Sequence, residues 1–278
     1  MNYKWRYDYR ISKKFFRFLL GGGLFVRTDG VIRDEYEKSW KNSGISIAHV
    51  NTLKKKRFLL QDQPIVSSPM QYIQAYLRRI HQEMANSESV LELGSGNGLN
   101  LLLLAVLNPQ IKVLRGVDLT RSGVQMAEQL AASPPINELG QITGLPDDTV
   151  IRTLRGRDFQ FLVGDMRALP FEAGTFDCVF SRQAIEQMPR DYPQVFDEAF
   201  RVVKSGGVGI FLEEFRESQN IFNLMYLKMH DFFRVSCAVV EKAGFHIEKF
   251  ETMPLSNLKY HIGALVVKKP SHKDPVLP

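Results

Sequence analysis

The sequence predicts an α/β fold in which helices cover both faces of a doubly wound, mostly parallel sheet, giving three layers. From about Pro69 onward, short apolar runs typical of buried strands alternate with longer runs of helical spacing. This alternation favours parallel strands joined by right-handed crossovers. We expect strands near residues 89–93, 111–117, 159–163, 176–181 and 207–213, and helices near 99–107, 121–131 and 191–204.

Two further strands close the predicted sheet. A helix around 231–243 ends at Gly244, and strands near 245–252 and 261–268 follow it. The loop between these strands contains Pro254, so the two strands can form an antiparallel hairpin.

Length and composition favour one domain with additions rather than two equal domains. The chain has 278 residues, of which 44% are hydrophobic. We assign residues 69–270 to this domain, 1–68 to a basic N-terminal extension and 271–278 to a tail. Residues 133–157 are rich in proline, glycine and charge, so we expect an insertion loop there, more often a surface excursion than a substrate-binding segment.

Cysteine usage and hydropathy favour a cytoplasmic protein. Cys178 and Cys237 sit in apolar surroundings and form no metal-ligand pattern, as expected of thiols in a reducing compartment. No apolar run approaches the roughly 20 residues that span a bilayer. The run 18–26 is short, lies between Arg17 and Arg27 and lacks a small-residue cleavage site, so it does not fit a signal peptide.

The most specific motif is a strand that runs into a glycine-rich turn and then into a helix. Residues 90–98 read Val-Leu-Glu-Leu-Gly-Ser-Gly-Asn-Gly. Glycines there let the backbone approach a ligand closely, and free amides at the start of the next helix face that ligand. Glu92 would repel a pyrophosphate but suits a ligand with cationic groups. Leu99 stands where a dinucleotide-binding motif needs its third glycine.

Further motifs follow this turn in order. Asp118 ends a predicted strand about twenty residues later, where an acid can accept hydrogen bonds from ribose hydroxyls. Residues 159–166 end in Gly-Asp-Met, 169–181 contain Thr-Phe-Asp-Cys-Val-Phe-Ser, and 201–207 read Arg-Val-Val-Lys-Ser-Gly-Gly. This ordered set resembles the class I S-adenosylmethionine-dependent methyltransferases, whose motif I corresponds to residues 90–98.

The resemblance implies a seven-stranded sheet that ends in the hairpin, with S-adenosylmethionine as the cofactor. The site should lie beyond the carboxyl ends of the strands. The residues that the resemblance places around the cofactor are Glu92, Gly94, Ser95, Gly96, Asn97, Gly98, Asp118, Leu119, Asp165, Met166, Ser181 and Gln183. We predict no metal, although Glu213 and Glu214 with Asp231 could bind a divalent cation.

The sequence defines the catalytic group less well, because many relatives carry Glu-His where this chain has Glu186-Gln187. A hydroxyl acceptor needs a base within hydrogen-bond reach. Our candidate catalytic residues are therefore His230, Asp231 and Glu186. His246, His261 and the pair Glu213-Glu214 remain alternatives.

The sequence favours O-methylation of a small molecule, a sugar or glycan, or a lipid-linked hydroxyl. Enzymes that methylate exocyclic amines of nucleic-acid bases usually carry Asn/Asp/Ser-Pro-Pro-Tyr after the fourth strand, whereas residues 181–184 read Ser-Arg-Gln-Ala. The Pro-Cys nucleophile of cytosine C5 enzymes is also missing. The alternatives are a tRNA or protein methyltransferase, or a cofactor-binding regulatory subunit without turnover.

Positive charge is concentrated at the N-terminus. Residues 1–19 hold six basic side chains and one acidic one, a net charge of +5, while the whole chain carries +6. Four of the basic residues share one face of a predicted helix: Arg10, Lys13, Lys14 and Arg17. Such a helix could contact a membrane or another anionic surface, or could be a lid over the cofactor.

Overall fold

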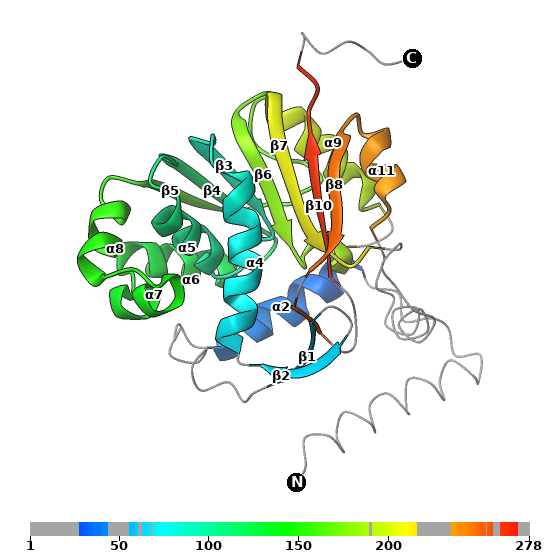
Figure 1. The fold of residues 1–278 in the computed structure, drawn as a ribbon. Helices are drawn as coiled ribbons and strands as arrows, with labels where there is room; N and C mark the ends of the chain where they lie inside the picture. Colours follow the sequence, from blue (N-terminus) through cyan, green and yellow to red (C-terminus); the bar gives the residue numbers. More distant parts are fainter. Residues whose placement is uncertain are drawn as a thin grey trace.

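The computed structural model describes residues 28–43, 56–60, 63–67, 69–188, 191–215, 235–253, 255–257 and 262–271. A seven-stranded sheet lies at the centre of the fold, with helices on both of its faces (Figure 1). The predicted three-layer α/β class is therefore confirmed.

The order of strands in the sheet is β5-β4-β3-β6-β7-β10-β8. The first five strands of this order pair in parallel, whereas β10 pairs antiparallel with both β7 and β8. The terminal hairpin predicted from sequence is thus the antiparallel edge of the sheet. The bounds of the strands are β3 Ser89–Leu93, β4 Val113–Asp118, β5 Asp158–Val163, β6 Phe176–Arg182, β7 Val203–Glu213, β8 His246–Thr252 and β10 Gly263–Lys268.

The helices bury two separate cores against this sheet. One core combines side chains of α4 (Pro69–Glu83), α5 (Leu99–Leu107) and α6 (Arg121–Ala132) with one face of the strands. The other core combines α9 (Pro193–Val202) and α11 (Cys237–Lys242) with the opposite face. α5 is apolar almost throughout, and its six central residues are all buried, so it anchors the glycine turn that precedes it.

The predicted insertion loop at 133–157 is wrong in its structure, because the segment folds into two short helices. α7 (Ile136–Thr143) and α8 (Asp147–Leu154) pack on α5. Leu139, Ile142 and Val150 are buried in the core that α5 shares. The prolines begin the two helices rather than preventing them, which conceals the helical spacing in the sequence.

The N-terminal extension was predicted to be helical, and the structure adds strands to it. α2 (Asp29–Ser43) is followed by an antiparallel pair, β1 (Lys56–Leu60) and β2 (Gln63–Ser67). β1 also pairs with β9 (Leu255–Asn257), which lies in the predicted loop of the terminal hairpin. The basic helix predicted within residues 1–19 lies outside the described residues. Within the described part of the chain, no helix is long and apolar enough to cross a membrane.

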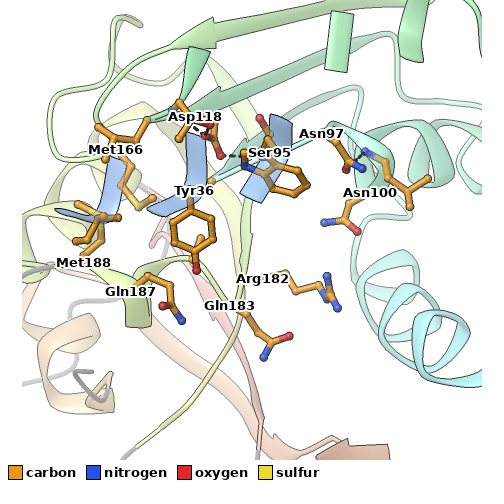
Figure 2. A pocket seen from close by; sticks show the side chains of 18 of the residues that line it. Tyr36, Ser95, Asn97, Asn100, Asp118, Met166, Arg182, Gln183, Gln187 and Met188 are labelled. Carbon is orange, nitrogen blue, oxygen red and sulfur yellow. Dashed lines mark hydrogen bonds between the residues drawn. The ribbon is translucent and has the colours of Figure 1, made fainter. Parts of the chain in front are cut away.

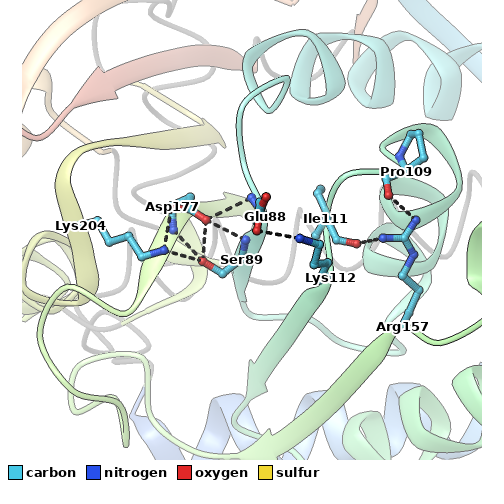
Figure 3. A network of polar contacts seen from close by, with 8 residues as sticks. All are labelled: Glu88, Ser89, Pro109, Ile111, Lys112, Arg157, Asp177 and Lys204. Carbon is cyan, nitrogen blue, oxygen red and sulfur yellow. Dashed lines mark hydrogen bonds and ion pairs between the residues drawn. The ribbon is translucent and has the colours of Figure 1, made fainter.

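A polar network ties β3 to β6 at the end of the sheet opposite the glycine turn (Figure 3). Oδ2 of Asp177 accepts hydrogen bonds from the amides of Glu88 and Ser89 at 3.0 and 2.9 Å, and from Oγ of Ser89 at 2.8 Å. Nζ of Lys204 lies 2.7 Å from Oδ1 of Asp177. Burial alone would raise the pKa of Asp177, but the Lys204 and Ser89 contacts outweigh it and hold the pKa below its usual value.

We expect Asp177→Asn to lower the free energy of unfolding by about 2 kcal/mol at neutral pH, because an amide cannot serve all of these donors. Because the pKa of Asp177 is lowered, its contribution is present above the ordinary value of 3.8 and is lost as the pH falls through the folded value. The difference between variant and wild type should therefore shrink in acid. Urea denaturation measures both effects. Asp158→Asn is the control, since that carboxylate is 60% exposed and its pairing with Arg115 should contribute little.

Candidate functional site

The glycine-rich turn between β3 and α5 depends on glycine for its backbone shape. Gly94 and Gly96 have φ of 72° and 51°, in the left-handed region that other residues rarely adopt. A Cβ on Gly94 would lie 2.3 Å from Cβ of Ala184, and one on Gly96 would lie 2.5 Å from Cζ2 of Trp40. The turn therefore approaches both neighbouring segments as closely as a backbone can.

Asp118, at the end of β4, holds this turn in place. Its Oδ2 accepts a hydrogen bond from the amide of Gly96 at 2.8 Å. Its Oδ1 accepts from the amide and the hydroxyl of Thr120, at 2.9 and 2.5 Å. A carboxylate has about four acceptor positions, so one position remains for a further donor.

A cavity of about 320 Å³ opens beside the turn (Figure 2). Its lining is largely apolar or aromatic, with a few polar side chains, as is usual for small-molecule sites. The residues around it are Ile32, Tyr36, Trp40, Ile73, Tyr76, Gly94, Ser95, Gly96, Asn97, Leu99, Asn100, Asp118, Leu119, Thr120, Met166, Arg182, Gln183, Ala184, Gln187 and Met188.

α2 forms one wall of this cavity through residues spaced by four: Ile32, Tyr36 and Trp40. Glu37 holds the helix in place, because its carboxylate accepts from the amides of Arg121 and Ser122 at 2.7 and 3.2 Å, at the start of α6. Since free amides at a helix start attract negative charge, this contact fixes α2 over the glycine turn.

A chain of partly buried hydrogen bonds supports the part of the lining formed by Tyr76 and Asn100. The Tyr76 hydroxyl donates to Oδ1 of Asn100 at 2.9 Å, and Nδ2 of Asn100 donates to Oε1 of Glu92 at 2.6 Å. Burial raises the pKa of Glu92 to about 8, although the Asn100 hydrogen bond opposes this shift. The Arg182 guanidinium lies over the Tyr76 ring, 3.8 Å from its centre.

A second group of carboxylates lies behind the segment that links β6 to α9. Oε1 of Glu213 accepts from the Ser181 hydroxyl at 2.6 Å and from the Ala184 amide at 3.3 Å. Its Oε2 accepts from the amide of Glu186 at 3.3 Å, and Oε2 of Glu186 accepts from the amide of Glu214 at 2.7 Å. Burial raises the pKa of Glu213 to about 7, and burial beside Glu213 and Glu214 raises that of Glu186 well above its usual value.

Residues 91–211 match a family model described as a methyltransferase domain. This region contains the glycine turn, Asp118 and the segment between β6 and α9. This part of the chain is a class I S-adenosylmethionine-dependent methyltransferase domain. The resemblance that the sequence motifs carry is thus confirmed, and the matched domain is that of an enzyme that uses this cofactor.

The curated relatives of this methyltransferase domain are matched over short segments. A demethylmenaquinone methyltransferase of Lactococcus lactis is 42% identical over 57 residues, which cover 20% of this chain and 22% of the relative. One of Staphylococcus epidermidis is 29% identical over 103 residues, 35% of this chain and 42% of the relative. The matched part of the chain therefore spans less than half the length of these relatives.

Solved structures resemble the methyltransferase over most of its length. The [4+2]-cyclase SpnF superposes with a TM-score of 0.61 at 15% identity, over 88% of this chain and 97% of that chain. A geranyl diphosphate C-methyltransferase of Streptomyces coelicolor superposes with a TM-score of 0.58 at 11% identity, over 86% of this chain and 98% of that chain. At such identities these similarities show the fold alone.

The geometry of the methyltransferase site fits S-adenosylmethionine. The glycine turn supplies a close backbone approach, and Asp118 retains acceptor capacity for ribose hydroxyls. Two buried oxygens around the turn have no hydrogen-bond partner, namely Oε2 of Glu92 and Oγ of Ser95. Such atoms are costly unless a ligand or water satisfies them, and Ser95 lines the cavity, so its hydroxyl fits a polar group of the cofactor.

Eight of the twelve residues predicted to bind the cofactor line the cavity: Gly94, Ser95, Gly96, Asn97, Asp118, Leu119, Met166 and Gln183. The other four do not line it. Glu92 lies behind Asn100, Gly98 caps α5, and Asp165 pairs with Arg167 at 2.5 Å. Ser181 is fully buried and turned toward Glu213.

Of the three candidate catalytic residues, the structure describes Glu186. His230, Asp231 and His261 lie outside the described residues. Glu186 is 5% exposed and lies behind the wall, where its contacts are to backbone and to Gln187. Within the described ranges, no group of three or more His, Cys, Asp or Glu residues could hold a metal ion.

Sequence reasoning missed the walls that α2 and α4 supply, together with several polar residues of the cavity. The missed residues are Ile32, Tyr36, Trp40, Ile73, Tyr76, Leu99, Asn100, Thr120 and Met188. The spacing of Ile32, Tyr36 and Trp40 by four is a weak signal of one apolar helix face, because charged residues surround it in the sequence.

Proposed function

We propose that the chain transfers the methyl group of S-adenosylmethionine to a hydroxyl of a small, largely apolar acceptor. The observation that supports this proposal is that one cavity is lined both by the glycine turn and by an apolar wall from α2 and α4. Ile32, Tyr36 and Ile73 on this wall suit an apolar ring or chain better than a free sugar. Among the acceptors that the sequence leaves open, this favours a small molecule or a lipid-linked hydroxyl over a glycan.

The cavity walls supply binding and orientation. When bound, the cofactor supplies an electrophilic methyl group on a sulfonium. Asp118 and the amides of the turn would hold its nucleoside part, and Trp40 would cover it. Holding donor and acceptor close and in line contributes several kcal/mol to lowering the barrier.

The names of the relatives agree with a small-molecule acceptor. The curated relatives are named for demethylmenaquinone, and one structural neighbour is a C-methyltransferase of geranyl diphosphate. The second name makes transfer to carbon a specific alternative to transfer to oxygen. We further propose that the protein is cytoplasmic and that its basic N-terminus brings it to a membrane that holds a lipid-linked acceptor.

Label transfer tests this proposal. The full-length protein is incubated with methyl-labelled cofactor and a panel of 1-naphthol, an alkyl-substituted phenol, a hexose, tRNA and a protein extract. We expect label only in 1-naphthol and the alkyl-substituted phenol, and we expect NMR to identify the products as methyl ethers. The control reaction contains saturating S-adenosylhomocysteine.

Three results would contradict the proposal. Label on a ring carbon would replace O-methylation by C-methylation. Label confined to tRNA or protein would show that the acceptor is a macromolecule and not a small, largely apolar molecule. Binding of S-adenosylhomocysteine with no transfer to any acceptor would favour the regulatory subunit.

A further inference from the structure

The described cavity wall offers no obvious proton acceptor. It contains no histidine, and its one carboxylate, Asp118, already accepts three hydrogen bonds from the glycine turn and Thr120. Gln187 stands where many relatives carry a histidine, and its Nε2 donates to Oε1 of Glu186 at 3.2 Å. An amide cannot take a proton at neutral pH, so Gln187 cannot replace that histidine as a base.

The wall does contain one strong cation. Among the described residues that line the cavity, Arg182 carries the one positive charge and Asp118 the one negative charge. Figure 2 shows these two side chains on different sides of the cavity, with Arg182 near Gln183 and away from the glycine turn. The charge distribution therefore separates a nucleoside side, at Asp118, from a side that suits an anion.

The Arg182 side chain is held in position by buried groups. Its guanidinium stacks on Tyr76, which is 3% exposed and is fixed by its hydrogen bond to Asn100. The guanidinium lies over the Tyr76 ring, and its N–H donors lie in the plane of the guanidinium. The charged or titratable groups that interact with it are Tyr76 of α4, under the guanidinium, and Glu92 of β3.

The backbone after Arg182 is strained in a way that fits a functional site. Gln183 has φ of 52° and is the one non-glycine residue with positive φ in the described chain. Its amide donates to the carbonyl of Leu212 at 2.9 Å, and the next amide, of Ala184, donates to Glu213. Such strain persists only where the surroundings enforce it, and it is concentrated at functional sites.

We propose that Arg182 binds the oxygen of the acceptor that receives the methyl group and holds it as an anion, so that the acceptors are acidic hydroxyls of the phenol or enol type. This inference rests on the proposed function and narrows its substrate class. The hydroxyl releases its proton to water, and an oxygen lone pair forms the new O–C bond. The S–C bond breaks, and the sulfur keeps its electron pair.

The ionisation of a bound phenol provides a readout that does not depend on turnover. The probe is 4-nitrophenol, titrated by phenolate absorbance in the presence of the full-length protein and saturating S-adenosylhomocysteine. An adjacent opposite charge lowers a pKa by about one to three units, so we expect the bound phenol to ionise about tenfold or more readily than the free phenol. Arg182→Gln should abolish this shift, and Arg182→Lys should keep part of it. 4-Nitroanisole, which cannot ionise, should bind the wild type and Arg182→Gln equally.

Two controls separate the acceptor from the cofactor and from a structural role. Arg155→Gln changes an exposed arginine remote from the cavity and should leave the shift intact. Calorimetry with S-adenosylhomocysteine should give affinities within about threefold for the wild type and Arg182→Gln, well below a tenfold change of 1.4 kcal/mol. A large loss of cofactor affinity would instead assign Arg182 to the cofactor carboxylate and overturn the proposal.

Other outcomes also overturn the proposal. No binding of 4-nitrophenol, or an unchanged shift in Arg182→Gln, would remove the anion site. If His230→Ala abolished transfer while Arg182→Gln retained it, the histidine predicted from sequence would be the base. After any of these outcomes, the proposed function would still stand if the wild type transferred the methyl group to 1-naphthol. If that transfer failed, the proposed function would itself be wrong.

Discussion

Gly94→Ala should weaken cofactor binding by at least about 100-fold while the sheet remains folded. The new Cβ would lie 2.3 Å from Cβ of Ala184, and the residue would have to adopt φ of 72°. The left-handed backbone costs about 1–2 kcal/mol, and overpacking costs about 1–3 kcal/mol more. Either the turn or the segment at Ala184 must move, and both line the cavity. Calorimetry with S-adenosylhomocysteine measures the loss of affinity, and circular dichroism monitors the fold.

Gly144→Ala is a matched control that has the cost of the left-handed backbone without the steric clash. Gly144 has φ of 75°, but nothing lies within 4 Å of its would-be Cβ. This variant should lose stability by about 1 kcal/mol and bind the cofactor normally. Adding Ala184→Gly to Gly94→Ala should restore part of the affinity by removing the steric clash. Equal cofactor affinities of Gly94→Ala and Gly144→Ala would show that the close approach at Ala184 is unimportant.

The elements that the sequence predicts correctly are those with local signals. α5 was expected at 99–107 and is observed at Leu99–Leu107, because an uninterrupted apolar run follows the glycine turn. The seven-stranded, mostly parallel sheet with its antiparallel terminal hairpin follows from the family resemblance and from alternating strands and helices. The pairing of β1 with β9 has no such signal, since it joins segments about two hundred residues apart whose side chains carry no register of their own.

The candidate site was predictable in its glycine turn and not in its walls. α2 is rich in charged residues, so its stripe of Ile32, Tyr36 and Trp40 is hard to recognise without a partner surface. Ser181 and Gln183 were both expected beside the cofactor, but the Ser181 side chain is directed toward Glu213, and of the two only that of Gln183 is directed to the cavity. That direction depends on the left-handed backbone at Gln183, which sequence patterns of helix and strand do not encode.

The protein should lose stability as the pH rises from about 5 to 8, and Glu186→Gln should reduce this loss. Glu213 keeps its proton up to about pH 7 in the folded state, against an ordinary value of 4.5 in the unfolded chain. Between these values the unfolded state has released the proton and the folded state has not, so stability falls by about 1.4 kcal/mol per pH unit. Between pH 4.5 and about 7, Glu213 alone should lower the free energy of unfolding by about 3 kcal/mol. Glu186 adds a fall of the same sign, because burial and the charges of Glu213 and Glu214 raise its pKa.

Glutamine at 186 resembles the protonated acid, so it removes the cost of a second buried charge. Its oxygen can still accept from the amide of Glu214, and rotation of the Gln187 amide can restore the other hydrogen bond. Urea denaturation should show Glu186→Gln about 1–3 kcal/mol more stable than wild type at pH 8 and nearly equal at pH 5. Glu172→Gln, an exposed control, should follow the wild type at both values. Parallel pH profiles for Glu186→Gln and wild type would contradict the shared burial of these carboxylates.

The same titration should reach the cavity, because Glu213 accepts hydrogen bonds from the backbone that follows Arg182. When Glu213 and Glu186 are both ionised, their repulsion acts directly on the segment that carries Gln183 and Gln187. Affinity for a non-ionising probe such as 4-nitroanisole should therefore fall above about pH 8 in the wild type, and less in Glu186→Gln. A neutral probe isolates the wall from the ionisation of the acceptor. If Glu213 and Glu186 supported only the fold and not the shape of the site, the affinity for 4-nitroanisole would stay constant as the pH rises above 8.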